Sequence, residues 1–186
     1  KLSGETAAEV ADIGNAFGYG AQEAGKVQAA FTGMGVEAGK AADMQRDLAA
    51  EAMKAGLNVG TIMKDIAESS AETAIFFGGN VKKLKDAAIE AGKLGVSLKT
   101  MAKVAEGLLD IEGSIGKQME ASVLIGRQLN LDRARQLALS GDLEGVLGEV
   151  RKQVGGEAEF NRLNVIQRKK LAEAVGLSTS ELARLT

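Results

Sequence analysis

The sequence of 186 residues contains no cysteine, histidine, proline or tryptophan. Without cysteine, the chain forms no disulfide, no thiol nucleophile and no thiolate metal site. Without histidine, histidine-dependent catalytic triads, HExxH zinc sites and histidine-ligated haem are excluded. Carboxylate sites for Mg²⁺ or Ca²⁺ are the metal chemistry that remains open.

The sequence also lacks an excess of charge of either sign. The chain has 23 basic and 25 acidic residues, which gives a net charge of −2. The two signs are spread evenly along the sequence, so no basic field attracts nucleic acid, and we expect no specific nucleic-acid binding. No apolar run approaches the ~18 residues that would indicate a membrane-spanning helix.

Small residues are what the sequence has in quantity. It contains 30 alanines and 24 glycines but only five phenylalanines and one tyrosine. The absence of proline, together with abundant Ala, Leu, Glu and Lys, favours helix almost everywhere. Runs that alternate apolar and polar residues, as strands do, are missing. The sequence therefore predicts an all-α protein.

Residues 5–55 carry apolar or small residues at alternating spacings of three and four, interrupted only by the polar Gln45. This seven-residue period predicts one long Gly/Ala-rich helix with a coiled-coil-like seam. Each internal glycine costs about 1 kcal/mol relative to alanine, so we expect the helix to form only against other copies or a surrounding wall. A flexible arm is the alternative. The predicted subunit interface consists of Val10, Ile13, Phe17, Val27, Phe31, Met34 and Leu48.

The remainder, 56–186, is predicted to be a compact array of short helices, separate from the subunit-packing segment 1–55. Its recurring signal is a glycine, an apolar residue and a small polar residue, at 56–58, 95–97 and 176–178. Glycine provides the left-handed position that ends one helix, and Asn or Ser caps the next. We expect about seven helices, of which 97–127 is the longest after residue 80.

An apolar stripe runs along that longest predicted helix. Two interpretations are open: the stripe faces the core of a helical bundle, or it forms a seam between subunits. Its members are Met101, Val104, Leu108, Ile111, Ile115, Met119 and Ser122.

Motifs for catalysis fail on inspection. Residues 20–26 fit the start of a P-loop, but Val27 stands where Ser or Thr would bind Mg²⁺, and no strand precedes the motif. Asp110 and Glu112 lie two apart and therefore point to different faces of a helix. We predict that the chain is not an enzyme and has no catalytic, cofactor or metal site.

Five segments taken together resemble a known family. They are LLDIEGSI at 108–115, IGRQLNLDRAR at 125–135, ALSGD at 138–142, EFN at 159–161 and LAEAVGLS at 171–178. In this order and spacing they resemble the tape measure proteins of long-tailed bacteriophages, particularly the contractile-tailed kind. The resemblance covers about residues 90–186, and more weakly 56–90.

This resemblance implies a structural protein of the virion. Such proteins lie in the lumen of the tail tube, set the tail length, take part in tail assembly and leave ahead of the genome on ejection. The implied partners are assembly chaperones, tail tube proteins, baseplate hub proteins and two further copies in a homo-trimer, with host membrane contact on ejection. The chain would be a fragment from near the baseplate end. The residues proposed for hub contact or packing are Leu171, Val175, Leu177, Leu182 and Leu185.

Two alternatives stay open from the residues alone. A soluble α-helical protein-interaction module would use its helix corners to present short helices to a partner. A membrane-active helical protein would use the GxxxG spacings at 14/18, 35/39 and 56/60 for close helix packing in lipid.

Overall fold

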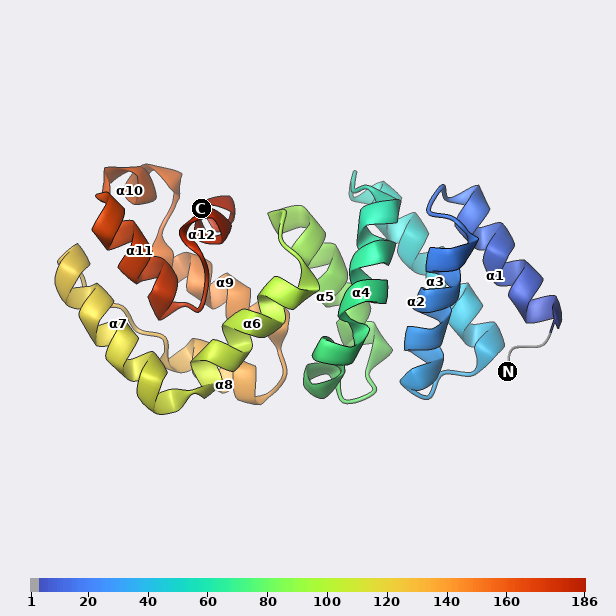
Figure 1. The fold of residues 1–186 in the computed structure, drawn as a ribbon, viewed down its shortest axis with the longest axis horizontal. Coiled ribbons are helices and arrows are strands. Elements are labelled where there is room, and N and C mark those ends of the chain that lie inside the picture. The colour runs from blue at the N-terminus through green and yellow to red at the C-terminus, as the bar shows by residue number, and fades with distance from the viewer. Residues whose placement is uncertain (1–3) are drawn as a thin grey trace. The chain divides into compact units, whose positions relative to one another are not determined.

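The computed structural model describes residues 4–186, apart from the side chains of residues 70–73 (Figure 1). Every element in the described part is a helix, and this part contains no strand, which confirms the all-α prediction. The chain divides into two compact units, Lys1–Lys93 and Leu94–Thr186. The division differs from the predicted 1–55 and 56–186, because the helices of the first segment pack on α4, which follows it.

Unit 1 is built around α2, which contacts three other helices of the unit, α1, α3 and α4. Much of its core is alanine: Ala24, Ala41, Ala42 and Ala49 are all fully buried. Small side chains let the helix backbones approach closely but bury little apolar area each. The helices of this unit are α1 (Gly4–Ala16), α2 (Ala21–Gly33), α3 (Ala38–Lys54), α4 (Val59–Phe77) and α5 (Val81–Leu94).

The predicted long helix over 5–55 is wrong, because the structure places three shorter helices there (Figure 1). The chain turns at Gly18 and Gly20, whose φ angles are 76° and 83°, and again at Gly35, with a φ of 89°. These left-handed conformations are open to glycine and unfavourable for other residues. The glycines therefore end helices, whereas the periodic pattern alone suggested that they lie inside one.

A chain of hydrogen bonds crosses the core of unit 1. The Tyr19 hydroxyl donates to Gln45 Oε1 at 3.1 Å, and Gln45 Nε2 donates to Gln28 Oε1 at 2.8 Å. Gln28 Nε2 in turn donates to the carbonyl of Ala38 at 2.7 Å. Both glutamines are fully buried, and burial raises the pKa of Tyr19 to about 12. Gln45, the one polar residue of the seven-residue pattern, thus has its partners inside the chain.

Unit 2 packs α8 and α9 against α6, and α11 along α7 (Figure 1). Its core contains large aliphatic side chains, among them the fully buried Leu98, Leu108, Leu131 and Leu147. The helices are α6 (Leu98–Leu109), α7 (Ile111–Ile125), α8 (Asp132–Leu139), α9 (Leu143–Val154), α10 (Glu157–Arg162), α11 (Val165–Ala174) and α12 (Thr179–Leu185).

The three predicted corners are confirmed. Asn58, Ser97 and Ser178 each accept a hydrogen bond from the backbone N–H three residues on, as N-caps of α4, α6 and α12. The preceding glycines have φ angles between 67° and 73°. Ser178 and Glu181 form a complete capping box.

The predicted helix over 97–127 is interrupted at Asp110. This residue ends α6, and its carboxylate accepts a hydrogen bond from the N–H of Gly113 as the N-cap of α7. Asp therefore acts here as a cap, because its short side chain competes with the backbone for hydrogen bonds. The breaks at 17–20, 34–37 and 110 divide two predicted helices into five, and the short helices α10 and α12 add to these, so the described part contains more helices than the seven expected.

Candidate interaction surface

Helix α7 has its polar face turned inward. Ser114 and Ala121 are its only buried residues among those described, and Gln118 and Ser122 on the same side are half-buried. Helices at the surface of a globular unit ordinarily bury their apolar side. In α7 the inward side is instead held by hydrogen bonds.

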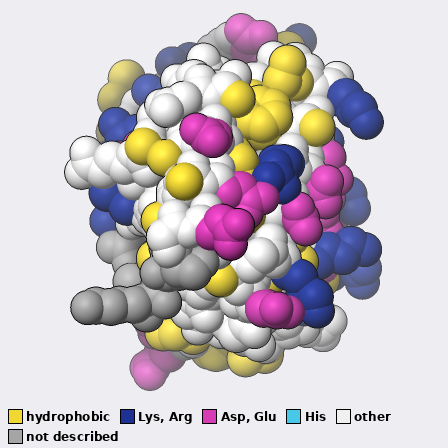
Figure 2. Space-filling model, turned by 90° about the vertical axis from the view of Figure 1, so that its right-hand side faces the viewer, with side chains coloured by type: hydrophobic (Ala, Val, Ile, Leu, Met, Phe, Trp, Pro, Cys, Tyr) yellow, Lys and Arg dark blue, Asp and Glu magenta, His cyan; other side chains and the backbone are white. Residues whose placement is uncertain are grey.

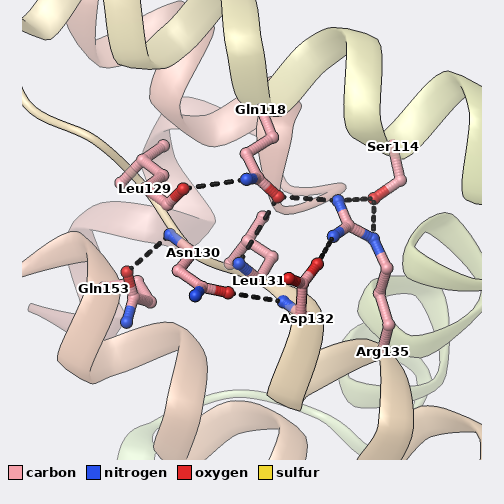
Figure 3. A network of polar contacts seen from close by, with 8 residues as sticks. All are labelled: Ser114, Gln118, Leu129, Asn130, Leu131, Asp132, Arg135 and Gln153. Carbon is pink, nitrogen blue, oxygen red and sulfur yellow. Dashed lines mark hydrogen bonds and ion pairs between the residues drawn. The ribbon is translucent and has the colours of Figure 1, made fainter.

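The centre of these hydrogen bonds is Arg135 of α8, whose residue surface is 5% exposed (Figure 3). Its Nε and Nη2 both donate to Ser114 Oγ, at 3.1 and 2.9 Å. Nη2 also donates to Gln118 Oε1 at 2.7 Å, and Nη1 to Asp132 Oδ1 at 2.8 Å. A buried charge needs such partners, and this guanidinium has both a carboxylate and neutral acceptors.

The same side chains fix the loop between α7 and α8 (Figure 3). Gln118 Nε2 donates to the carbonyl of Leu129 at 2.8 Å, and the N–H of Leu129 donates to Ser122 Oγ at 3.0 Å. From the other side, Gln153 Oε1 accepts from the N–H of Asn130 at 2.9 Å. We call this set of hydrogen-bonded residues the Arg135 network: Ser114, Gln118, Ser122, Leu129, Asn130, Asp132, Arg135 and Gln153. These hydrogen bonds connect α7, α8, α9 and the loop to one another.

One exposed ridge of α7 is apolar, and the charged residues Glu112, Lys117 and Glu120 of the same helix are exposed as well. Four side chains spaced by four residues form what we call the α7 stripe: Ile111, Ile115, Met119 and Val123. They are 45%, 43%, 64% and 82% exposed. In sequence the polar series runs one residue ahead of the stripe, since Ser114, Gln118 and Ser122 come directly before Ile115, Met119 and Val123. The two ridges therefore lie side by side on the helix, one inward and one outward.

The start of α11, beside the end of α7, also exposes apolar side chains. Gln167 Nε2 donates to the carbonyl of Leu124 at 2.8 Å, which places the start of α11 beside the end of α7. Lys170 and Glu120 form an ion pair at 2.9 Å farther along the two helices. At the end near Leu124, which is 39% exposed, Val165 and Ile166 are 79% and 64% exposed.

These positions answer the question left open by the apolar stripe of the sequence. Met101, Val104 and Leu108 are buried in the core of unit 2, as the bundle interpretation predicts. Ile111 and Met119 are exposed beyond the break at Asp110, so they do not fill a core. The interpretation of this half as a seam between subunits stays a prediction.

The predicted subunit interface lies largely inside unit 1. Among its seven residues, Phe17 and Met34 are half-buried, and the other five are 4% exposed or less. Val10 and Ile13 form a cluster with Ala24 and Ala42, on which Phe17 packs. The interface stays a prediction, and it requires these helices to separate before they meet other copies.

The residues proposed for hub contact or packing are also buried, all at 5% exposure or less. They lie in α11, α12 and the corner between them, where Gly176 approaches the backbone of α6 closely. A hub contact through these side chains stays a prediction. Neither the burial of Arg135 nor the exposure of the apolar ridge of α7 was identified from the sequence. The sequence does contain one indication of both: a polar series at Ser114, Gln118 and Ser122 beside the apolar one.

Unit 1 carries a groove of about 450 Å³ between α1 and Arg46 of α3. Figure 2 shows the face of the molecule on the α1 side, where acidic side chains gather near the centre. Arg46 pairs with Glu9 and, at 2.6 Å, with Asp43, and hydrogen bonding to Glu9 is the main cause that raises its pKa. Because Glu9 lies in α1 and Arg46 in α3, this ion pair holds the two helices of unit 1 together at the groove.

Within the described residues there is no group of three or more acidic, cysteine or histidine side chains placed to hold a metal ion. Lys26, the lysine of the incomplete P-loop, pairs with Glu23 at 2.9 Å. Asp110 serves as a helix cap. No helix in the described part is both long enough and apolar enough to span a membrane.

Comparison of the chain with protein-family models, with curated proteins and with solved structures finds no match.

Proposed function

We propose that this chain is a structural segment of a phage tail tape measure protein. The observation that carries the proposal is the ordered set of five segments between residues 108 and 178 that resembles this family. In the virion it would lie in the tail tube lumen or at the baseplate hub, set tail length and take part in assembly and genome ejection.

The place of the five segments in unit 2 supports this proposal. Residues 108–115 contain the cap at Asp110 and the first half of the α7 stripe, and 125–135 contain half of the Arg135 network, including Arg135 itself. Residues 138–142 and 171–178 form helix corners closed by glycines with positive φ. The resemblance thus falls on the residues that determine where helices end and how they are tied together.

The composition of the helices supports passage through a narrow tube. Most are short and contain glycine at internal positions, as Gly25 in α2 and Gly148 in α9 do. Isolated helices of this length are marginal in water, so their stability depends on tertiary packing. A chain with no proline and no disulfide can unfold and extend without a slow isomerisation or reduction step.

The proposed partners are two further copies, tail tube and baseplate hub proteins, and assembly chaperones, with host membrane contact on ejection. Copies packed in parallel inside a tube would present their apolar helix faces to one another. The subunit seam in 5–55 then forms after unit 1 opens.

Tail length tests the proposal directly. In the virus that encodes the chain, an in-frame deletion of the 93 residues of unit 1 should shorten the tail by about 140 Å, if each residue spans 1.5 Å as helix. Electron microscopy of purified particles measures the length. Tails of unchanged length would contradict the proposal.

Mass spectrometry of purified wild-type tails gives an independent reading, which does not depend on whether the deletion variant assembles. Peptides from both units should be present in intact tails and depleted from particles that have ejected their genome. Absence of the chain from intact tails would reject the proposal.

A second candidate is the protein-interaction module. The exposed α7 stripe, backed by the rigid Arg135 network, favours it. This candidate predicts that the chain binds a partner through unit 2 outside any virion.

A further inference from the structure

We propose that the α7 stripe is the contact surface for a second copy of this chain, packed antiparallel about a two-fold axis. The stripe lies on a helix whose other face already has its polar partners in the Arg135 network. Its four apolar side chains are between 43% and 82% exposed. Contiguous apolar surface of this kind marks interaction sites on soluble proteins.

The spacing of the stripe makes it complementary to itself. Its members recur every four residues, which forms a single ridge along α7. A two-fold axis through the midpoint of such a ridge maps the ridge onto itself, so two copies of α7 aligned antiparallel bring equivalent positions together. When two copies pair about the midpoint, Ile111 lies opposite Val123 of the second copy, and Ile115 lies opposite Met119.

Gly116 lies close to this midpoint. A Cβ atom added there would meet nothing within 4 Å. Because Gly116 has no side chain, the backbone of α7 is accessible beside Ile115, and a large side chain of the second copy can pack against it. Small residues at helix contacts allow this closer approach.

Charge decides the direction of the pair. Asp110 and Glu112 stand at the start of the stripe, and the exposed Arg127, whose Nη2 donates to the carbonyl of Val154 at 3.1 Å, follows its end. An antiparallel pair brings the acidic end of one α7 toward the basic end of the other, and it also opposes the helix dipoles. A parallel pair would place like charges together. Glu120 is already neutralised by Lys170 of the same chain.

The extension onto α11 enlarges the contact. A standard interface buries about 800 Å² per partner, so a stable pair must reach beyond one helix face. Leu124, Val165 and Ile166 are further exposed apolar side chains at the end of α7 and the adjacent start of α11. In the antiparallel pair they lie toward the start of α7 of the second copy.

The antiparallel pair through the α7 stripe would form between chains in solution, outside a tail tube. Copies that run in one direction inside a tube cannot form it, because a two-fold axis across α7 reverses the helix. The inference is therefore separate from the proposed function, and it concerns the form that the chain takes in solution.

Disulfide trapping tests both the surface and the direction. The chain has no cysteine, so single Ile111→Cys and Val123→Cys variants each carry one thiol. On mild oxidation of a mixture, we expect disulfides that join the two variants in preference to either variant joined to itself. Products of one variant alone, or no products, would overturn the antiparallel pair.

Light scattering across concentrations gives the second measurement. The wild-type mass should rise from 19.3 kDa toward twice that value. Met119→Lys should raise the dissociation constant about tenfold or more, because a charge at the interface centre costs over 1.4 kcal/mol. Leu139→Lys is the matched control, since Leu139 is 72% exposed in the same unit but outside the stripe. A wild-type monomer at every concentration, or a mass insensitive to Met119→Lys, would overturn the proposal.

Discussion

At the scale of single residues, a buried guanidinium decides which side of α7 is left for contacts. Arg135 draws Ser114 and Gln118 inward, so the neighbouring isoleucines and Met119 point outward. The hydrogen bonds are numerous enough to satisfy the groups that burial removes from water. A charged residue in the interior thus determines an apolar exterior.

Removing that guanidinium should be costly. Arg135→Ala leaves the buried Ser114 hydroxyl without its donor and removes one of the two donors to Gln118 Oε1, and we expect a loss of about 3 kcal/mol in the free energy of unfolding. Urea denaturation followed by circular dichroism measures it. Arg133→Ala is the control: its side chain is 71% exposed and pairs with Glu149 at 3.8 Å. Loss of this surface pair should change stability by less than about 1 kcal/mol. Equal effects of the two variants would contradict the structural role given to Arg135.

Two glycines of unit 1 should respond to the same substitution in opposite directions. A Cβ on Gly14 would lie 2.3 Å from the carbonyl oxygen of Gly20, whereas a Cβ on Gly25 would meet nothing within 4 Å. Gly14→Ala should therefore destabilise the chain by about 1–3 kcal/mol through overpacking. Gly25→Ala should stabilise it by up to about 1 kcal/mol, through helix propensity. Thermal unfolding of the two variants measures the difference, and a stabilising Gly14→Ala would refute the close approach.

At the scale of elements, the chain is organised by its helix ends. The N–H of Leu57 donates to the carbonyl of Ala52, and that of Leu177 to Ala172, both at 2.9 Å. These bonds close the last turn of a helix around a left-handed glycine. The next helix then starts from a capping side chain one residue later. Repeated use of this corner divides the sequence into short helices.

The cap of α12 should make stability depend on pH. Hydrogen bonding to Ser178, through its side chain first and its backbone N–H second, lowers the pKa of Glu181. A lowered folded-state pKa adds stability above the unfolded value of 4.5, and this stability is lost as the pH falls through the folded-state pKa. Glu181→Gln keeps an acceptor but removes the charge that faces Lys103 at 3.7 Å. Melting temperatures measured from pH 7 to pH 3 should fall less steeply for this variant, and an identical pH profile would contradict the assignment.

At the scale of the whole molecule, the chain consists of two units with their own cores. Unit 1 has alanine-rich packing around α2 and a buried chain of glutamines. Unit 2 has leucine-rich packing around α6 and the Arg135 network.

Unit 2 should therefore fold alone. A fragment of residues 94–186 is expected to be helical, to unfold cooperatively, and to lose melting temperature on Arg135→Ala as the full chain does. Circular dichroism of the fragment and its variant measures this. A fragment without cooperative unfolding would show that the units are not independent.

Much of the fold could be predicted from local chemistry. The corners at 56–58, 95–97 and 176–178 follow from glycine, an apolar residue and a capping side chain in order, and the structure confirms them. The turns at 17–20 and 34–37 could not be predicted this way. Gly20 and Glu37, the residues that precede α2 and α3, make no side-chain cap, so the periodic pattern across them appeared unbroken.

The sequence shows the spacing of the α7 stripe, but it does not show that the stripe is exposed. The apolar spacing of Ile111, Ile115 and Met119 is readable, but so is the polar spacing of Ser114 and Gln118 beside it. Which ridge faces inward depends on Arg135, 17 residues beyond Gln118, and on the loop that returns it to α7. No local rule supplies a contact across that distance.

The sequence by itself determined the helical class, the corners and the exclusion of cysteine and histidine chemistry, because these depend on residue type and near neighbours. Only the tertiary structure decided that residues 5–55 fold back as three helices and that α7 turns its apolar ridge to solvent. The physical reason is that burial and hydrogen-bond partners are set by residues far apart in the chain, which periodicity does not contain.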